Sequence, residues 1–548
     1  MEDEAAKKAV KRHESRMGRR GLWDQHWDDV ARVFNPRRQG FVTETVEGDR
    51  RTEDIYDSTP MQAARSLANQ TGYFLRPEGQ TYFSIVADSE VLNDDEEAKL
   101  WLSAAEDELN DALENPRARF RQATGEADLD LVTLGTGVLF VGEGARNNSL
   151  LFQSVHLKDG VVSWDDEGNP NGFSRIKRMT IGNAVQRFGI DAFSDEVKEK
   201  HRRGNIDDKI RILHAVERRE DGRENAVFAK NLPWSDVWIE YDARRTLQEG
   251  GYHEFPFVIP RWDTSSGEEY GRSPAMIALP DGNTLQAMGE TMLVAGQRVA
   301  DPPLFVPNDG SFTEAFTFPG GITSYDVETA VQVRGNPYFA LDTGANLPIT
   351  REMQMDVRDL VWQAFFRNVL NLPVDGPEMT ATEIRQRREE FIRQVGPVFG
   401  RLESDYTAPI IERSFNIMLR ANALPPIPEA LQGQNVRFVY ESPVKWIRQQ
   451  IEAAAAQLWV REQIEIAGAT GKPEILDIVN FDGYARTTAE IAGIPTEMVN
   501  PTDVVQAARE ARAQQQAAQA QALQAQQVAE IAKTGADALK SAGVTEAA

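Results

Sequence analysis

The chain has 548 residues and no cysteine, and its formal net charge is −25 at pH 7. Such a length exceeds what one hydrophobic core supports, so several domains or sub-domains are expected. The lack of cysteine excludes disulfides and thiolate metal sites, and the acidic balance argues against an ordinary nucleic-acid binder, which needs Lys and Arg to neutralise phosphate. No apolar run approaches the roughly 20 residues that span a bilayer, so no membrane partner is expected. The charged N-terminus also lacks the apolar segment of a secretory signal.

Residues 1–35 are predicted to form an amphipathic helix that ends at Asn35-Pro36. Apolar side chains recur along it at the spacing of one helix face, namely Trp23, Trp27, Val30 and Phe34. The segment is also rich in basic residues, which we interpret as a solvated helix face: Lys7, Lys8, Lys11, Arg12, Arg16, Arg19 and Arg20.

A second helix is predicted to begin at Ser58 or Thr59, because Pro60 then occupies its first turn. A strand at Tyr82–Val86 follows, and then a helix at Asp94–Ala112 whose acidic start complements the helix dipole. The glycines between residues 131 and 144 do not form a dinucleotide-binding pattern and are interpreted as turn and close-packing positions.

Between residues 150 and 265 short strands alternate with turn residues, which is typical of meandering hairpins, and one helical stretch is predicted near 181–203. The predicted strands are Leu150–His156, Gly160–Trp164, Phe173–Thr180, Ile210–Glu217, Ala226–Phe228, Val237–Tyr241 and Phe257–Arg261.

A helix at Asp281–Ala300 is followed by residues 301–345, where Pro, Gly and short apolar runs predict a small β excursion. The next stretch, Leu347–Asn422, reads as a helix, a Pro/Gly interruption at Leu372–Pro377 and a longer helix. A capping box at Thr380 and Glu383 marks the restart, and a kink is predicted at Gly396-Pro397.

The C-terminal part begins with one more predicted strand at Asn435–Glu441, and helices return over residues 444–500. Residues 513–529 carry no charge and consist almost wholly of Ala and Gln. Such a segment favours helix by propensity but offers few side chains for a core. It is therefore expected to be either disordered or packed in a ring or bundle of copies.

No pattern in the sequence carries catalytic chemistry. The six histidines do not show metal-binding spacing, and no catalytic residue, metal ligand or cofactor is predicted. Gly468–Lys472 superficially matches a phosphate-binding loop, but it lacks the spacer, and Pro473 stands where Ser or Thr would bind Mg²⁺. A turn that ends a helix is the better interpretation, and no enzymatic activity is expected.

Five stretches together resemble the head-to-tail connector (portal) family of short-tailed bacteriophages. They occur in the family's order: Ile55–Thr59, Phe255–Trp262 (FPFVIPRW), Gly267–Pro274 (GEEYGRSP), Leu279–Leu285 (LPDGNTL) and Met379–Ile384 (MTATEI). The resemblance implies a non-enzymatic α+β protein, mainly helical, that assembles as a ring of twelve copies at one capsid vertex of the virion. Assembly would take place in the host cytoplasm.

The resemblance also implies the partners. Double-stranded DNA would pass through the channel without sequence specificity during packaging and ejection. The ring would contact capsid and scaffold proteins, the large subunit of the packaging terminase and then tail adaptor proteins. A ring of copies at −25 each would repel phosphate rather than trap it, provided that the acidic groups face the channel.

Mapped onto this chain, the family's parts fall in sequence order. The wing would be residues 1–280 with a return at 425–443, the stem helices 281–300 and 346–372, and the clip 301–345. A channel loop at 373–379 and a long kinked helix at 380–424 would follow, then a crown at 444–500 and a barrel helix or disordered tail at 501–548.

The channel loop carries the site residues that the resemblance implies. They are Asn371, Leu372, Pro373, Val374, Asp375, Gly376, Pro377 and Glu378. The loop contains two carboxylates and no Lys or Arg, so any grip on DNA would depend on shape. Thr380 and Glu383 would fix where the loop ends.

Two alternatives remain open on the sequence alone. The first is another virion component, such as a scaffold or internal core protein without a closed ring, for which the Ala/Gln tail would suffice. The second is a hydrolase or nuclease with an unrecognised site.

Overall fold

The computed structural model describes residues 3–46, 48–78, 82–89, 92–93, 95–144, 150–223, 228–308, 316, 318–326, 339–340, 347–367, 396–440, 443–491, 498–500 and 502–541. It combines helices with four small sheets. The chain divides into two compact units, residues 1–444 and 445–548. None of the described helices is long and apolar enough to cross a membrane.

The N-terminal segment forms two helices, α1 (Glu4–Arg19) and α2 (Gly21–Phe34), so the prediction of one continuous helix was wrong. Arg20 separates them. Its guanidinium is buried and donates to the Leu157 and Gly160 carbonyls and to Asp24. The interpretation of the basic residues as a solvated face is therefore wrong for Arg20. A buried cation needs hydrogen-bond acceptors, and the break between α1 and α2 places this guanidinium beside three of them.

Three helices form the middle of the first unit: α3 (Thr59–Leu75), α5 (Glu96–Glu114) and α6 (Phe120–Leu134). The predicted starts of α3 and α5 are confirmed, and the Asp95 side chain caps α5 by accepting from the Ala98 amide at 3.0 Å. The sequence did not predict α6, because buried polar residues such as Asp128 and Asp130 obscure its apolar period.

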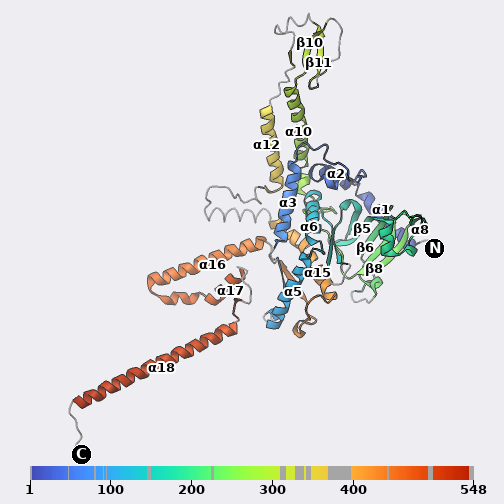
Figure 1. Ribbon diagram of the computed structural model, residues 1–548. Helices are drawn as coiled ribbons and strands as arrows, with labels where there is room; N and C mark the ends of the chain where they lie inside the picture. The colour runs from blue at the N-terminus through green and yellow to red at the C-terminus, as the bar shows by residue number, and fades with distance from the viewer. Residues whose placement is uncertain are drawn as a thin grey trace, which may run out of the picture. The chain divides into compact units, whose positions relative to one another are not determined.

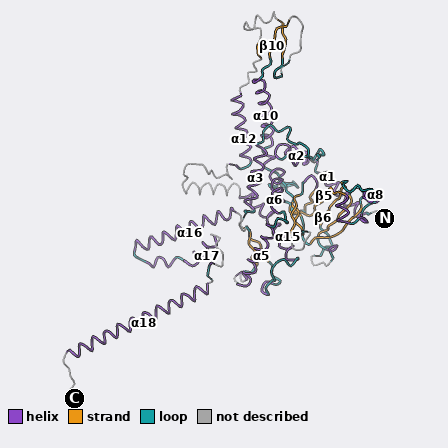
Figure 2. The backbone as a smooth tube through the Cα atoms, viewed as in Figure 1, coloured by secondary structure: helices purple, strands orange, loops and turns teal. Residues whose placement is uncertain are grey.

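The meander is confirmed as a five-stranded antiparallel sheet in the order β4-β5-β6-β7-β8. Its strands are Gly160–Trp164, Pro170–Thr180, Lys209–Glu217, Trp234–Glu240 and Arg245–Tyr252. Helix α1 covers one face through Ala6 and Val10. The other face packs on α7 (Ile181–Phe188) and α8 (Asp195–Arg202). Figure 2 shows these strands in orange beside the helices.

The structure corrects this region in three places. The stretch near 181–203 is two helices, because Gly189 adopts φ +81° between them. Strand β8 was missed, since it is mostly polar and contains Gly250-Gly251 just before its last residue. The segment predicted at Phe257–Arg261 forms a ladder only over β9 (Phe257–Val258), which pairs with β2 (Leu139–Glu143), and Arg261 adds an isolated bridge to Thr136. On its other side β2 pairs with β3 (Leu150–Ser154). Of the strand predicted at 226–228, Phe228 is not extended sheet, and the other two residues lie outside the described ones.

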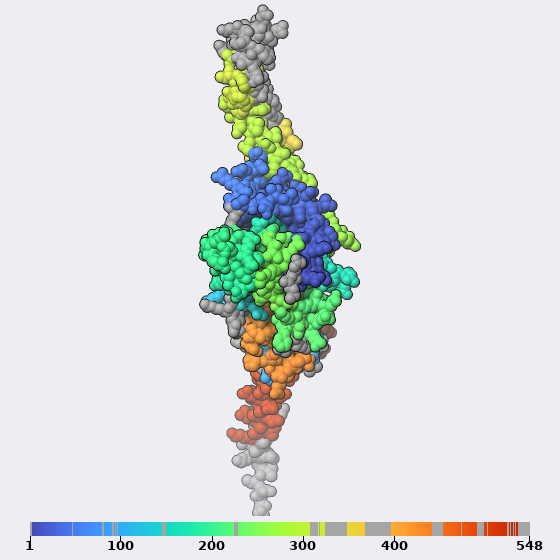
Figure 3. Space-filling model, turned by 90° about the vertical axis from the view of Figure 1, so that its right-hand side faces the viewer, coloured from blue at the N-terminus to red at the C-terminus, as the bar shows by residue number. Residues whose placement is uncertain are grey.

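A helix pair with a sheet at its end follows in the chain. The short α9 (Pro274–Ile277) leads into α10 (Leu279–Ala300), and α12 (Leu347–Ala364) lies beside α10. Between them stand β10 (Leu304–Asn308), β11 (Ile322–Asp326) and β12 (Phe339–Ala340), in the order β11-β10-β12. The β excursion between two helices is confirmed (Figure 1). Figure 3 shows α10 and β10, in yellow-green, extending beyond the blue and green residues of this unit.

The long second helix of the central stretch is described from residue 396. Residues 396–402 are helical, a π-helical turn occupies Glu403–Thr407, and α15 spans Ala408–Arg420. The predicted kink at Gly396-Pro397 stays a prediction, because the residues before it lie outside the described ones. Both predicted strands of the remaining sheet are confirmed: β1 (Phe83–Ala87) pairs antiparallel with β13 (Val436–Tyr440).

The second unit is helical. Its elements are α16 (Pro443–Thr470), a 3₁₀ helix at Pro473–Ile478, α17 (Phe481–Ile491) and α18 (Thr502–Ser541). Gly471 at φ +66° ends α16, which confirms the turn predicted there. Arg509 binds Asp482 through both guanidinium nitrogens at 2.5 and 2.6 Å and so joins α18 to α17.

Candidate functional site

The helix pair α10 and α12 is the candidate site, because both helices expose large apolar side chains. On α10 these include Leu293 and Val299, and on α12 Met353, Met355 and Leu360, each about half exposed. Water-facing apolar side chains on neighbouring helices indicate a surface that another protein covers. The pair is therefore suited to association with further chains.

Asp57 fastens the start of α3 to both helices of the pair. One carboxylate oxygen accepts from the Thr59 amide at 2.9 Å, which supplies a partner for an amide in the first turn of α3. The other accepts from the Arg358 Nε at 2.9 Å and the Gln354 amide at 3.3 Å, both on α12. Burial by itself would raise the pKa of Asp57, but the bonds from Thr59 and Arg358 outweigh it and lower that pKa.

Gln286 makes the matching connection to α10. Its side-chain oxygen accepts from the Tyr56 and Asp57 amides at 2.8 and 2.9 Å, and its nitrogen donates to the Asp57 carbonyl at 2.8 Å. Gly289, one turn further along α10, leaves room for Tyr56, whose Cβ lies 2.8 Å from where a side chain would begin. The short segment before α3 is thus clamped against α10 as well as α12.

Apolar contacts complete the base of the pair. The rings of Phe34 and Phe365 lie 5.5 Å apart, and Phe34 also packs close to Gly282 near the start of α10. Val361 on α12 and Phe365 directly after this helix are buried. Because the start of α10 and the end of α12 meet the same helix α2, the two helices run antiparallel from one anchored base.

One of the motifs quoted above, Gly267–Pro274, forms the support beneath this base. Tyr270 is buried against Trp27, with ring centroids 4.9 Å apart. Ser273 caps α9 by accepting from the Met276 amide at 3.1 Å, and its hydroxyl donates to the Thr133 carbonyl at 2.7 Å. Gly267–Pro274 is thus a structural connection that orients α9 and α10 on α6.

Replacing Asp57 by Ala is expected to loosen the base by about 2 kcal/mol, because Arg358, Gln354 and the Thr59 amide all lose their acceptor. Hydrogen exchange should rise in α10 and α12 and in the first turn of α3. The matched control is Asp54→Ala, which removes an exposed carboxylate three residues away. Equal exchange in the two variants would contradict a role for Asp57 in holding the pair.

The residues that the sequence analysis assigned to the site lie outside those that the structure describes. This holds for Asn371–Glu378 and for Thr380 and Glu383, so their roles stay predictions. The structure instead brings together Asp57, Gln286 and Arg358, which the sequence analysis did not assign. Of these three residues only Asp57 could have been recognised in the sequence, because its side chain can bind a backbone amide of a helix that begins with Thr59-Pro60. The other two come from distant parts of the chain.

Three histidines are buried in the first unit, and burial in each case lowers the pKa, to about 4 for His13, about 3 for His156 and about 4 for His214. These lowered pKa values leave the three imidazoles uncharged at neutral pH, and each ring also forms a hydrogen bond, for example between His13 Nδ1 and the Ser174 hydroxyl at 2.9 Å. Among the described residues, no three carboxylate or imidazole groups gather closely enough to hold a metal ion.

Two phage proteins resemble this chain over most of its length. The chain is 29% identical over 502 residues to a probable portal protein of Bordetella phage BPP-1, covering 91% of this chain and 89% of the relative. It is 27% identical over 507 residues to a portal protein of Salmonella phage epsilon15, covering 90% and 89%. A chain in the virion of a native gene transfer agent particle aligns with a TM-score of 0.37 at 12% identity, over 81% of this chain and 94% of that one.

The family described as bacteriophage head to tail connecting protein matches residues 6–499, which is most of the chain. This match includes every motif on which the resemblance was based and confirms it. The chain belongs to the bacteriophage head-to-tail connecting protein family.

Proposed function

We propose that the chain is a phage portal protein: identical copies form a ring at one capsid vertex, and its channel conducts double-stranded DNA during packaging and ejection. The observation that carries this proposal is the family match over residues 6–499. The relatives named as portal proteins support it, since each aligns over about nine tenths of this chain. The protein would act without catalysis, as a component of the virion assembled in the host cytoplasm.

The parts of such a ring follow the order given by the resemblance. Residues 1–280 and 425–443 would form the wing, α10 and α12 the stem, and residues 301–345 the clip. The clip would bind the terminase first and the tail proteins afterwards. The apolar side chains exposed on α10 and α12 support this arrangement, because neighbouring copies in a closed ring would cover them.

Residues 444–500 would form the crown and residues 501–548 the barrel. In the second unit Leu458, Trp459 and Ile464 of α16 are about half exposed, and every described side chain of α18 except that of Val505 is exposed. A lone helix with so little packing is marginal in water, whereas copies around one axis would bury its sparse apolar side chains. The tail was expected to be either disordered or packed against other copies. We therefore propose the second, with the tails of twelve copies packed around the axis of the ring.

Deleting Leu372–Glu378 tests the ring and the channel loop in one experiment. Electron microscopy of the purified full-length chain should show closed rings with twelve-fold symmetry, and the deletion variant should form the same rings. DNA packaging or retention should fall only with the deletion. A chain that stays monomeric at micromolar concentration over a range of salt would contradict the portal and favour a scaffold or core protein. Loss of rings on deletion would show that the segment is structural.

A further inference from the structure

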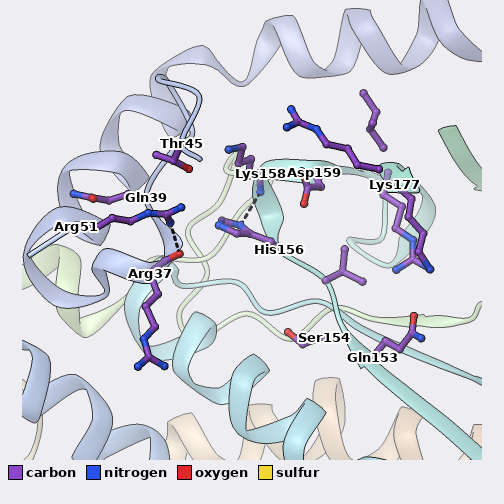
Figure 4. Close-up of a pocket in the computed structure, with 14 residues that line it drawn as sticks. Arg37, Gln39, Thr45, Arg51, Gln153, Ser154, His156, Lys158, Asp159 and Lys177 are labelled. Carbon is purple, nitrogen blue, oxygen red and sulfur yellow. Dashed lines mark hydrogen bonds between the residues drawn. The ribbon is translucent and has the colours of Figure 1, made fainter. Parts of the chain in front are cut away.

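A basic cavity of about 470 Å³ lies in the first unit, away from the helix pair. One wall is the 3₁₀ helix Pro36–Arg38 and the segment after it, including Arg37, Thr45 and Arg51. The other wall comes from β3, the 3₁₀ helix Leu157–Asp159 and the β5 residues Arg175–Arg178. Figure 4 shows the labelled side chains of these two walls around the cavity. The volume is within the roughly 300–1,000 Å³ typical of small-molecule sites.

The cavity lies beside the first residue of strand β4, Gly160, which pairs with Arg175 of β5. Strand β4 pairs with β5 only from Pro170 to Arg175, whereas β5 continues to Thr180. Beyond Arg175, β5 is therefore flanked by β6 on one side, and among the described strands none flanks the other. The residues just before β4 and the segment from 37 to 51 surround this open edge, which leaves a concave site instead of a continued sheet.

The charge of the cavity is opposite to that of the whole chain. Its lining contains one carboxylate, Asp159, against six cationic side chains: Arg37, Arg51, Lys158, Arg175, Lys177 and Arg178. His156 adds no charge at neutral pH, because burial lowers its pKa to about 3. Its Nδ1 accepts from the Lys158 amide at 3.1 Å, so its Nε2 carries the proton and donates to the Arg38 carbonyl at 3.0 Å.

Most of these cations have no carboxylate partner. Arg178 pairs with Glu44 at 2.9 Å, and none of the other five forms an ion pair with any residue that the structure describes. Arg175 is buried and packs over the rings of Phe140 and Phe257, with its Nε donating to His214 at 3.3 Å. Burial, aided by Arg175 and Arg187, lowers the pKa of Lys177 to about 8. Asp159 offsets part of this charge through Lys158, Arg178 and Arg175, but one carboxylate against six cations leaves a positive excess that favours a bound anion.

The donors around the cavity suit phosphate better than a single carboxylate. Guanidinium groups present paired N–H donors that match phosphate oxygens, and ammonium groups add point charges. The hydroxyls of Thr45 and Ser154 and the amides of Gln39 and Gln153 supply neutral donors on both sides. A carboxylate side chain would satisfy only one or two of these groups and would fill little of the volume.

We propose that this cavity is a binding site for a phosphate group, borne either by a free nucleotide or by a nucleic-acid strand. The site would lie on the part of the chain assigned to the wing, and it does not depend on the channel or on ring closure. Arg51, Lys158 and Lys177 would bind the phosphate oxygens, with the buried Arg175 supplying positive potential from beneath. Pairing of Arg178 with Glu44 leaves that residue at the margin.

The test uses the full-length chain at low salt and three probes in calorimetry and fluorescence anisotropy: pyrophosphate, adenosine monophosphate and a labelled 12-nucleotide single strand. Saturable binding is expected, and the double variant Arg51→Gln/Lys177→Gln should weaken it by at least about tenfold, because charge-assisted bonds are lost. The matched control Lys8→Gln/Arg203→Gln removes one Lys and one Arg that are exposed elsewhere and should change affinity by less than about twofold. Thermal unfolding checks that both variants fold, and Lys158→Gln replaces the double variant if it does not.

The probes also separate the sources of the phosphate. Binding of pyrophosphate or the nucleotide, with competition against the strand, identifies a free phosphate ester as ligand. Binding of the strand alone identifies a nucleic-acid backbone. The proposal is overturned if no probe saturates below about 10 mM, which corresponds to less than about 3 kcal/mol. It is also overturned if the double variant binds like the control, or if poly-glutamate binds while the phosphate probes do not. The last result would assign the cavity to an acidic peptide.

Discussion

Gly271→Ala is expected to destabilise the first unit by about 3 kcal/mol or more, because two backbones meet at this residue. A Cβ on Gly271 would lie 2.3 Å from the carbonyl oxygen of Gly135, and a Cβ on Gly135 would lie 2.2 Å from the carbonyl oxygen of Gly271. Neither oxygen can easily move away. The Gly135 carbonyl accepts from the Trp262 amide at 2.9 Å, and the Gly271 amide donates to the Thr136 hydroxyl at 2.9 Å.

The substitution Gly271→Ala is also expected to destabilise the helix pair, because Gly271 lies in the motif that orients α9 and α10 on α6. Denaturant unfolding followed by circular dichroism should show a lower midpoint for Gly271→Ala, and α10 should exchange its amides faster. Gly125→Ala is the matched control, since Gly125 is exposed on α6 with nothing within 4 Å of a new Cβ. It should stabilise the helix by up to about 1 kcal/mol. Equal stability of the two variants would refute the close approach of the two backbones.

Arg76→Met is expected to cost about 3–5 kcal/mol, because it leaves a buried carboxylate without its cation. Arg76 follows α3 directly and binds Asp128 of α6 at 2.5 Å, and both residues are only 2% exposed. The guanidinium also lies over the ring of Tyr406, 4.7 Å from its centroid, in the π-helical turn before α15. One side chain thus joins three helical segments that are far apart in the chain.

A double variant separates two contributions to the stability lost in Arg76→Met: the unpaired charge of Asp128 and the lost packing of Arg76. Arg76→Met/Asp128→Leu should recover most of the lost stability, since a well-packed apolar pair can replace a buried ion pair at little cost. Burial already raises the pKa of Asp128, and removing Arg76 raises it further. In the single variant the folded protein therefore takes up a proton above the pH at which the unfolded chain does. Its deficit relative to the wild type should shrink as the pH falls towards 4. A deficit that is independent of pH and equal in the double variant would show that only packing is involved.

The positions of these residues explain what the quoted motifs do. Ile55–Thr59 contains Asp57, which binds both helices of the pair, and Gly267–Pro274 contains the close approach at Gly271 and the cap at Ser273. Both motifs anchor the base from which α10 and α12 extend. In the proposed ring, a fixed orientation of that base would let each copy present the same surfaces to its neighbours.

The sequence by itself determined the local elements where one signal dominates. Alternation with turn residues predicted the meander, and the Ser-Thr-Pro start predicted α3. Pro, Gly and short apolar runs after the helix predicted at Asp281–Ala300 indicated the β excursion that follows α10. The family could be inferred in the same way, because its motifs are contiguous stretches. None of this required knowledge of contacts between distant residues.

Only the tertiary structure decided how polar residues are used. The sequence pattern placed Arg20 on a solvated helix face. In the structure its guanidinium is buried and donates to two carbonyls more than a hundred residues away, at the break between α1 and α2. Helix α6 was missed because Asp128 and Asp130 are buried there, and their cations, Arg76 and Arg38, come from other segments. The anchor at Asp57 and the basic cavity are assembled in the same way. A polar group is stable inside a protein only with partners, and for these residues the partners are distant in sequence, so their roles follow from the fold alone.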